Sequence, residues 1–514
     1  MRALSFADYQ AADGDHFQAD VVVVGTGAGG AAAGTALAEA GLSVLFVEEG
    51  SHTPTSSFNP YMSESIPRLY RDAGTTAVMG TPNIPYIEGR AVGGTTVING
   101  GMSYRAPEHI LDGWARTLGD ESLGASGMDA LFSDVERSIS ASYQSEESIG
   151  DDNRLMYLGA QKLGWHSEIN RRNQASCVGA NNCILGCPTG AKQSTLVSYL
   201  PRAVAAGARI LSELRVDSLI IESGRCVGVS ARAIDPVTRK PGRVVQARGA
   251  AVIVACGAVH TPYLLLGHRL GRPSKQLGKH LLLHPNAKVI AQYPFETHSW
   301  KGVSQWTQVR EFHSEGILFA ENMIPPFALG PTLPWHGDES MAMLERYNRL
   351  VSTGVLVEDS TTGRVARSML GMPVARYDIT DWDLDRFVRG VARLCELHFT
   401  MGAEQVVLPY RTQPIARSMD EVRQISARSI KKKDLELFTV HLMGTARMGS
   451  RAVDSVVDLD GQLWDLPGCY VADASVFPTA IGVNPQMTIM ALATRTGRRL
   501  AERWSARPTL DAAA

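Results

Sequence analysis

Residues 20–30 read DVVVVGTGAGG, four valines that lead directly into a glycine-rich turn. A short β-branched run bounded by glycine predicts a buried parallel strand over residues 20–24. Residues 28–40 (AGGAAAGTALAEA) predict a helix of small side chains, and residues 43–47 (SVLFV) predict a second strand. This order predicts a βαβ unit of the Rossmann type.

The glycines of this turn have the spacing of a dinucleotide cradle. Gly25 allows the tight turn, Gly27 lets the backbone approach a pyrophosphate, and Gly30 lets the helix pack closely on the strand. The helix N-terminus favours the phosphate charge. Glu48 ends the second strand, where a carboxylate can accept hydrogen bonds from ribose hydroxyls. This βαβ unit predicts that a dinucleotide binds, but it does not distinguish NAD from FAD.

Composition sets broad limits on the fold and the partners. The chain has 514 residues, enough for two or three domains, with 44% hydrophobic and 20% charged residues. A formal net charge of -2 favours neither nucleic acid nor anionic lipid as a partner. Two basic clusters, Arg171-Arg172 and residues 431–433, are expected to be solvated surface.

The N-terminal segment carries no recognisable targeting signal. Residues 1–20 are polar and lack the basic start and apolar core of a signal peptide. No stretch reaches the roughly 18 apolar residues of a membrane span. We therefore expect a cytoplasmic protein without a transmembrane segment, and peripheral membrane contact stays open.

Two further motifs extend the pattern. Residues 89–100 (GRAVGGTTVING) are dense in glycine and small hydroxyl residues, which suits backbone lying against a flat ring or a pyrophosphate. His441 precedes a glycine turn and offers a base that titrates near pH 6.5. Asn484 offers a neutral amide, and Pro485 is a good first residue for a helix predicted over residues 486–504.

Taken in this order, the motifs resemble the glucose–methanol–choline (GMC) family of FAD oxidoreductases. The match continues through residues 252–258 (VIVACGA), 277–285 (LGKHLLLHP) and 471–475 (VADAS). The resemblance implies an α/β fold, with a discontinuous Rossmann-type FAD-binding domain and an antiparallel-sheet α+β substrate domain. It implies FAD as the cofactor.

The expected domain organisation has five segments. The FAD-binding domain is expected from residues 1–115, 196–286 and 439–514, the last carrying the catalytic His and Asn. Its middle part is expected to add strands near residues 209–214 and 250–255. Residues 116–195 are expected to form a lid and cysteine-rich connection. Residues 287–438 are expected to form the substrate-binding domain, with a cover helix over residues 381–403.

The resemblance also implies the cofactor-binding residues. The pyrophosphate is expected at Gly25, Gly27 and Gly30, and the adenosine ribose at Glu48. The expected residues near the flavin, the adenine and the phosphates are Arg90, Gly94, Thr95, Asn99, Gly100, Val216, Asp473, Ala474 and, at the helix N-terminus, Pro485.

By the same resemblance, His441 is the catalytic base. It takes the hydroxyl proton of a small-molecule alcohol while hydride leaves the carbon for flavin N5, and Asn484 orients the substrate oxygen. Some members of the family pair the catalytic His with a second His. Here Asn484 stands at that position, and its role is expected to persist. His284 is expected to be a hydrogen-bonded structural histidine.

Three closely spaced cysteines leave two hypotheses open. Cys177, Cys183 and Cys187, followed by proline, can ligate an iron–sulfur cluster, and their spacing resembles FAD sugar dehydrogenases with a three-iron cluster. Residues 186–192 (GCPTGAK) equally resemble long-chain alcohol oxidases, for which we assume no cluster. A structural or disulfide-linked loop is the alternative. The other four cysteines, at positions 226, 256, 395 and 469, are predicted to be small buried residues.

The expected function is FAD-dependent oxidation of a CH–OH group, in a bulky or long-chain apolar alcohol. One alternative is a sugar dehydrogenase whose iron–sulfur cluster passes electrons to a cytochrome or quinone. Others are a redox-silent FAD-containing lyase and an electron-transfer subunit that depends on a partner chain. The sequence leaves the electron acceptor open among oxygen, a quinone and a cytochrome.

Overall fold

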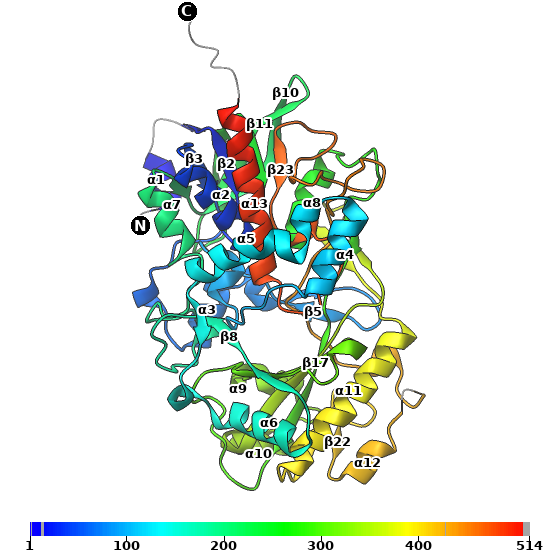
Figure 1. Cartoon of the computed structure of the whole chain (residues 1–514). Coiled ribbons are helices and arrows are strands. Elements are labelled where there is room, and N and C mark those ends of the chain that lie inside the picture. Colours follow the sequence, from blue (N-terminus) through cyan, green and yellow to red (C-terminus); the bar gives the residue numbers. More distant parts are fainter. Residues whose placement is uncertain (2, 12–14, 427, 507–514) are drawn as a thin grey trace, which may run out of the picture.

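A computed structural model describes residues 1, 3–11, 15–426 and 428–506 of the chain. It consists of two packed bodies, and the N-terminus and the last described helix, Gln486–Ser505, lie in the upper one (Figure 1). Each body has its own large hydrophobic core, one built around the N-terminal strands and the C-terminal helix, the other around a second sheet and its cover helix. The predicted α/β fold with a second, sheet-rich domain is confirmed.

The upper body contains a parallel five-stranded sheet. Its order is β23 (Cys469–Val471), β13 (Ala251–Val254), β2 (Val21–Val24), β3 (Val44–Val47) and β9 (Arg209–Leu211). All neighbours pair in parallel, and every residue of β2, β3 and β13 is buried. Continuous burial explains the uninterrupted apolar runs of these strands, and the strands predicted from those runs are confirmed.

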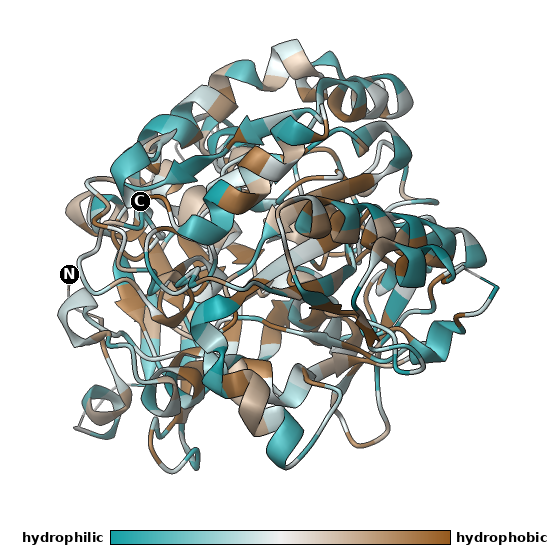
Figure 2. Cartoon of the chain, turned by 90° about the horizontal axis from the view of Figure 1, so that it is seen from below, coloured by the Kyte–Doolittle hydropathy of each residue, from teal (hydrophilic) through white to brown (hydrophobic). Residues whose placement is uncertain are grey.

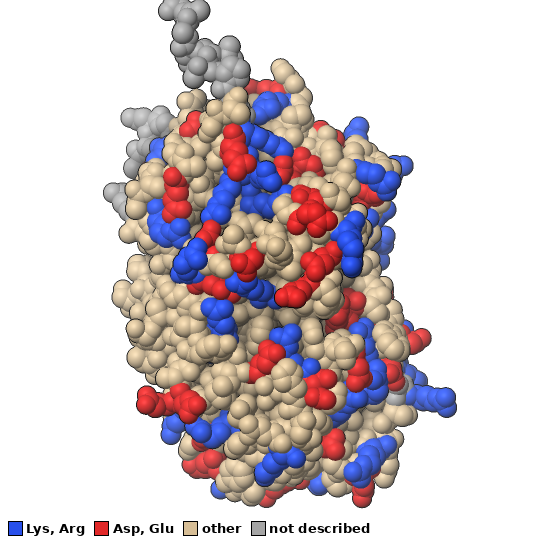
Figure 3. Space-filling model, in the orientation of Figure 1, with Lys and Arg blue, Asp and Glu red and all other residues tan. Residues whose placement is uncertain are grey.

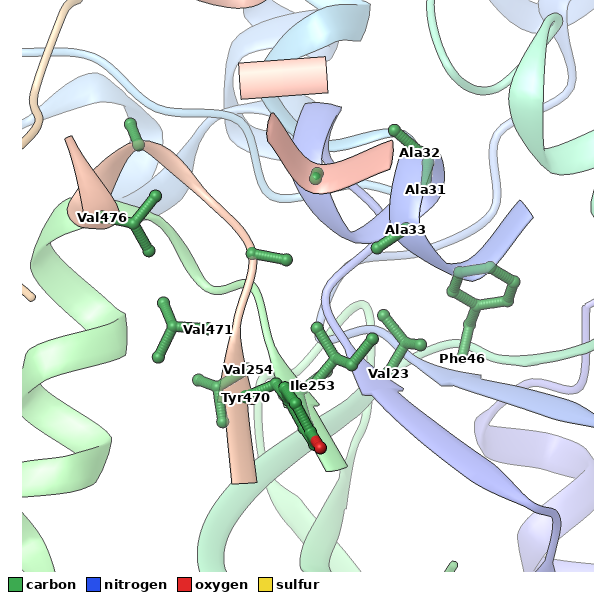
Figure 4. Close-up of a cluster of buried hydrophobic side chains, with 14 of the residues drawn as sticks. Val23, Ala31, Ala32, Ala33, Phe46, Ile253, Val254, Tyr470, Val471 and Val476 are labelled. Carbon is green, nitrogen blue, oxygen red and sulfur yellow. The ribbon is translucent and has the colours of Figure 1, made fainter. Parts of the chain in front are cut away.

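One helix of small residues lies on this sheet, and the C-terminal helix packs on that helix. Helix α2 (Ala28–Glu39) follows β2, and α13 (Gln486–Ser505) packs against it. A Cβ carbon on Gly497 would lie 2.6 Å from the carbonyl oxygen of Ala33, so the helices touch almost backbone to backbone. In Figure 4 the side chain of Ala33 lies near Val23 and Phe46 of the neighbouring strands. The close approach requires glycine and alanine here.

A second, smaller sheet completes the upper body. Its order is β1 (His16–Gln18), β12 (Pro241–Arg248), β11 (Arg225–Ile234) and β10 (Leu214–Glu222). The β10–β11 and β11–β12 pairs are antiparallel, and β1 adds in parallel.

The lower body is an antiparallel seven-stranded sheet under a long helix. The order is β22 (Ile415–Ala416), β21 (Gln405–Val407), β15 (Asn286–Gln292), β18 (Leu350–Val357), β17 (Ile317–Glu321), β16 (Thr307–Val309) and β7 (Ser167–Ile169). Helix α11 (Asp381–Thr400) begins with a capping box between Thr380 and Asp383 and packs on β15 and β18. Seen from below, brown strands lie among helices with teal outer faces (Figure 2). The predicted cover helix is confirmed.

The segment 116–195 contributes to both bodies. Helix α5 (Ala125–Ser138) packs on α13 above, whereas α6 (Asp151–Lys162) packs on α11 and β7 forms an edge of the lower sheet. The five predicted segment boundaries stay a prediction. The remaining elements are α1 (Phe6–Ala11), α3 (Met62–Leu69), α4 (Glu108–Leu118), α7 (Tyr199–Ala205), α8 (Gly257–Gly267), α9 (Pro326–Leu329), α10 (Asp338–Glu345), α12 (Met419–Arg423), β4 (Thr76–Val78), β5 (Ile84–Tyr86), β6 (Ala141–Tyr143), β8 (Arg171–Asn173), β14 (Lys279–Leu281), β19 (Gly363–Arg367) and β20 (Pro373–Arg376).

The surface is of mixed charge. Basic and acidic side chains alternate over the face shown in Figure 3, in keeping with the near-zero net charge. Among the helices that the structure describes, none is both long and apolar enough to cross a membrane.

Candidate active site

A cavity of about 960 Å³ lies where the two bodies meet. The upper body lines it with the glycine turn after β2, residues 94–96 and 98–102, and the N-terminus of α13. The lower body lines it with one face of its sheet, including Leu318, Ala320 and Leu356. The predicted cofactor motifs and the predicted substrate domain therefore open onto one space.

The glycine turn forms a cradle that side chains would fill. Gly25 has a φ of +99°, and a Cβ carbon there would lie 2.4 Å from the carbonyl oxygen of Ala255. A Cβ carbon on Gly30 would lie 2.1 Å from the oxygen of Gly25, so Gly30 serves helix–turn packing behind the cavity wall. At Gly27 the nearest atom to an added Cβ is 4.0 Å away, and this residue faces the cavity. The arrangement fits a pyrophosphate against bare backbone at a helix N-terminus.

Glu48 is buried beside the cradle, and its carboxylate is mostly occupied. Its Oε2 accepts hydrogen bonds from the backbone N and Oγ1 of Thr26 at 2.9 and 2.7 Å, and its Oε1 accepts one from the N of Gly50 at 2.9 Å. Burial raises the pKa of this carboxyl group. One acceptor position remains on Oε1, so Glu48 by itself can accept from one ribose hydroxyl rather than two.

Most other predicted cofactor residues also line the cavity. They are Gly94, Thr95, Asn99, Gly100, Val216, Asp473, Ala474 and Pro485. Asp473 accepts hydrogen bonds from the backbone N of Gly257 at 2.9 Å and of Ser475 at 2.8 Å, so it joins the start of α8 to the C-terminal segment. Arg90 is not among the lining residues. Its backbone N donates to the oxygen of Leu69 at 2.7 Å.

Two buried polar atoms near the N-terminus of α13 have no protein partner. The Nδ2 of Asn99 donates to the Oε1 of Gln486, which leaves Asn99 Oδ1 and Gln486 Nε2 buried without a hydrogen bond among the described residues. Both side chains line the cavity. An acceptor and a donor side by side, at a helix N-terminus, match the edge of a flavin ring that offers complementary groups.

His441 and Asn484 meet at the cavity wall. The Nδ2 of Asn484 lies 3.2 Å from the Nε2 of His441, and the Oδ1 of Asn484 accepts from the Nε2 of Gln308 at 3.4 Å. With its oxygen turned to Gln308, the Asn484 amide donates to His441, so Nε2 carries a lone pair and Nδ1 the proton. Burial lowers the pKa of His441 to about 4. A neutral imidazole with its basic atom at the cavity can accept a proton from a ligand.

His284 supports this pair from behind, in line with its expected structural role. Its ring packs edge-on against His441 with the centroids 5.8 Å apart. Its Nε2 accepts from the backbone N of Gly482 at 3.2 Å, and its own backbone N donates to Asp359 at 2.7 Å. Burial and the neighbouring His441 lower the pKa of His284 to about 3. It therefore stays neutral and holds the loop that carries Asn484.

The iron–sulfur prediction is not supported. No group of three or more His, Cys, Asp or Glu side chains arranged to hold a metal occurs in the described part of the chain. Cys183 is buried at the cavity and accepts from Arg172 at 3.4 Å, whereas the Sγ of Cys187 accepts from the backbone N of Lys192 at 3.4 Å. Cys177 does not line the cavity. All seven cysteines are free, so the loop is not disulfide-linked either.

Two basic residues hold this loop against the flavin motif, and the sequence motifs assigned neither a role. The Nζ of buried Lys192 donates to the carbonyl oxygens of Val97 at 2.7 Å, Asn99 at 2.8 Å and Cys183 at 2.5 Å. Arg172 is buried, contrary to the predicted solvated surface, and donates to the oxygen of Gly100 at 2.8 Å. Its burial follows from β8, which inserts beside residues 100–102.

The lower sheet adds polar residues that motif matching missed. Gln308, Asn286 and Lys288 reach the site from strands of the substrate domain. One sequence signal could have found two of them. In β15 the apolar residues at 287, 289 and 291 alternate with Asn286 and Lys288, so the polar pair must face away from the core.

Family models agree with this architecture. A GMC oxidoreductase model matches residues 66–286 and a second one residues 359–493. An FAD binding domain model matches residues 20–59, which contain the glycine cradle.

Several known proteins are similar to the chain. An uncharacterized GMC-type oxidoreductase of Mycobacterium tuberculosis is 36% identical, over 93% of this chain and 75% of its own length. Another uncharacterized GMC-type oxidoreductase, of Sinorhizobium fredii, is 33% identical over 93% of this chain and 94% of its own length. A long-chain-alcohol oxidase of Arabidopsis thaliana is 28% identical over 93% of this chain and 67% of its own length. The solved structure of pyridoxine 4-oxidase from Mesorbium loti has the same fold, with a TM-score of 0.69 and 18% sequence identity. The match covers 93% of this chain and 98% of that structure.

Proposed function

The chain belongs to the GMC oxidoreductase family, and on this premise we propose that it oxidises the CH–OH group of a bulky, largely apolar alcohol with His441 as base. The observation that carries the proposal is the contact between His441 Nε2 and Asn484 Nδ2 at the cavity wall. The uncharged base His441 and the neutral donor Asn484 suit an uncharged hydroxyl group. Both lie in the cavity that the two domains line.

The glycine turn and the flavin motif are proposed to hold FAD. Gly27 would leave room for the pyrophosphate at the start of α2, Gly25 would keep the turn tight, and Glu48 would accept from one ribose hydroxyl. The unpaired atoms of Asn99 and Gln486 would meet the flavin edge. When bound, FAD supplies a two-electron acceptor for the hydride that leaves the substrate carbon.

The chain's own residues then handle the proton. The substrate hydroxyl replaces the Asn484 contact at His441 Nε2 and gives its proton to that atom. The Asn484 amide donates to the substrate oxygen and keeps it directed at the base. Such a base contributes about 10²- to 10⁴-fold to the rate. His284 and Asp359 keep the pair in place through the backbone of the neighbouring loops.

The part of the cavity wall that the lower sheet forms supports an apolar substrate body. Leu318, Ala320 and Leu356 face the cavity from adjacent strands, and Met102 and Met323 add flexible apolar surface. The similarity to long-chain-alcohol oxidases of Arabidopsis thaliana supports the same class.

The test is anaerobic mixing of the FAD-loaded protein with a panel of long-chain, aromatic and sugar alcohols. Loss of the flavin absorbance band with apolar alcohols is the expected result. Full retention of the band, together with conversion of the alcohol by a redox-neutral route, would contradict the proposal and favour a lyase. Re-oxidation of the reduced protein by oxygen, a quinone analogue or a cytochrome then identifies the electron acceptor.

A further inference from the structure

Strand β15 places a cation on the face of the lower sheet that lines the cavity. Ala287, Val289 and Ala291 are fully buried in the lower core beneath α11. Asn286 and Lys288 lie on the opposite face of the strand and line the cavity. A lysine there is not a solvated surface residue, because its side chain opens onto the space where the proposed substrate binds.

The ammonium group of Lys288 has no anionic partner. Its Nζ lies 4.5 Å from the centroid of the Phe438 ring, and it forms no ion pair or hydrogen bond within the described ranges. The backbone of Phe438 pairs with that of Asn286 through two hydrogen bonds of 2.9 Å, three residues before His441. Lys288 and the proposed base therefore belong to the same cavity wall.

Neighbouring amides complete a polar subsite around this lysine. Gly354 is the register partner of Lys288, and a Cβ carbon there would lie 2.3 Å from Asn322 Nδ2 and 2.8 Å from Asn286 Oδ1. The Oδ1 of Asn286 is buried without a partner among the described residues. The Oδ1 of Asn322 accepts from Gln305 at 3.2 Å. The two asparagines thus converge over the glycine, beside the ammonium group.

A charge in this position favours a ligand that brings the opposite charge. Burial lowers the pKa of Lys288 to about 8, against the opposing effect of Glu321, so most of the population is protonated at neutral pH. Glu321 is itself engaged by the backbone N of Gln305 at 2.7 Å and by Ser304 at 3.1 Å. Lys288 is half-buried and its ammonium group opens onto the cavity without a counter-ion, so an arriving anion supplies the missing partner.

We propose that Lys288 and Asn286 bind a carboxylate of the substrate, so that the substrate is a hydroxy acid with an apolar body. A carboxylate matches the site because it is planar, carries a single charge and can accept from the Lys288 ammonium and from the Nδ2 of Asn286 together, with the Oδ1 of Asn286 turned away from it. The apolar residues Leu318, Ala320 and Leu356 would hold the chain between the carboxylate and the hydroxyl group. This inference rests on the proposed alcohol oxidation and names its substrate class.

The test compares ω-hydroxyalkanoates with 1-alkanols of the same chain length, in anaerobic flavin reduction by wild type and by Lys288→Met. We expect Lys288→Met to lower the preference for the hydroxy acid over the alkanol, measured as the ratio of their reduction efficiencies, by about 10- to 100-fold, the range of a charge-assisted contact. Lys288→Arg keeps the charge and should retain most of the preference. Lys301→Met, which removes a lysine that packs on Trp300 outside the cavity lining, is the matched control.

A second readout does not depend on turnover. Titration of the oxidised, FAD-loaded protein with an alkanoate, followed by the flavin spectrum, should give saturable binding that Lys288→Met weakens and the neutral alkanamide does not reproduce. Equal losses for hydroxy acid and alkanol, or a changed flavin reduction potential with unchanged alkanoate binding, would overturn the inference. If no alcohol reduces the flavin, the proposed function fails, whereas the alkanoate titration still decides the role of Lys288.

Discussion

His441 is kept neutral by burial rather than by a charged partner. Its ring is packed against His284, its Nε2 faces the amide of Asn484, and no carboxylate within the described residues forms an ion pair with it. Each of these neighbours is uncharged, so none stabilises an imidazolium ion before substrate arrives. The free protein therefore holds its base ready to accept a proton.

The pH dependence of flavin reduction follows from this environment. Because the pKa of His441 is lowered to about 4, its basic form is complete at pH values well above 4 and is lost as the pH falls through that value. We expect the second-order rate constant for flavin reduction to be flat from about pH 6 to 7 and to decline only below about pH 5. This rate constant is measured at each pH by stopped-flow mixing with a pH jump. An inflection at the ordinary histidine value near 6.5 would mean that His441 is solvated or is not the base.

Substitution of alanine for two glycines of the cradle is expected to have different effects. Gly27→Ala adds a methyl group to the cavity side of the turn, so we expect normal folding with at least about tenfold weaker FAD binding. Gly30→Ala places the methyl group against the backbone of Gly25, so we expect loss of thermal stability in the FAD-free protein as well. Thermal unfolding with and without FAD separates the two. Equal stability of both FAD-free variants would contradict the assignment of these positions.

At this scale, the sequence predicted residues whose chemistry is carried by local motifs. His441 and Asn484 come from separate motifs, and the structure brings them within 3.2 Å, although their roles stay predictions. Lys288 and Gln308 could not be found in that way. Each lies in an ordinary strand. Alternation along β15 places Lys288 away from the core, but only the assembled lower sheet determines that this face lines the cavity.

The cysteine-rich loop serves as a packing element for the flavin motif. The ammonium group of Lys192 donates to a carbonyl oxygen within the loop, that of Cys183, and to those of Val97 and Asn99 in the flavin motif. Arg172 of β8 donates to the carbonyl oxygen of the adjacent Gly100. The cysteine spacing suggested metal ligation, but these basic residues and their backbone acceptors decide the conformation. Of the two hypotheses for this loop, the iron–sulfur cluster is not supported, and the structure shows a loop with free cysteines.

Removal of the Lys192 ammonium group tests this interpretation. We expect Lys192→Met to lower the free energy of unfolding by about 3 kcal/mol or more, because three carbonyl acceptors lose a charged donor. Amide hydrogen exchange over residues 94–100 should increase at the same time. Lys240→Met, at an exposed position, serves as the control. Unchanged exchange in residues 94–100 would show that the loop does not hold the flavin motif.

The elements that sequence predicted best are those with continuous local patterns. The strands β2, β3 and β13 are short apolar runs next to glycine, and α11 and α13 have helical periodicity over 20 residues each. The antiparallel architecture of the lower body came only from family resemblance. Its strands pair over long sequence separations, and β7 joins from a segment more than a hundred residues before β16, which no local pattern encodes.

The two bodies have separate cores, and the cavity lies at their boundary. The upper body brings the cofactor cradle and the His441–Asn484 pair, and the lower body brings the apolar wall and Lys288. Neither body contains a complete site. The lower sheet also contacts the His441–Asn484 pair, because Gln308 of β16 donates to Asn484.

The central claim is that His441 removes the substrate proton during flavin reduction. Its most direct test is anaerobic stopped-flow reduction of the FAD-loaded His441→Ala protein by the best alcohol of the panel, with His280→Ala as a control for a histidine outside the cavity lining. We predict reduction slower than wild type by about 10²- to 10⁴-fold, with normal FAD content. Reduction at a rate close to that of wild type, in a protein of normal FAD content, would contradict the assignment of His441 as the base.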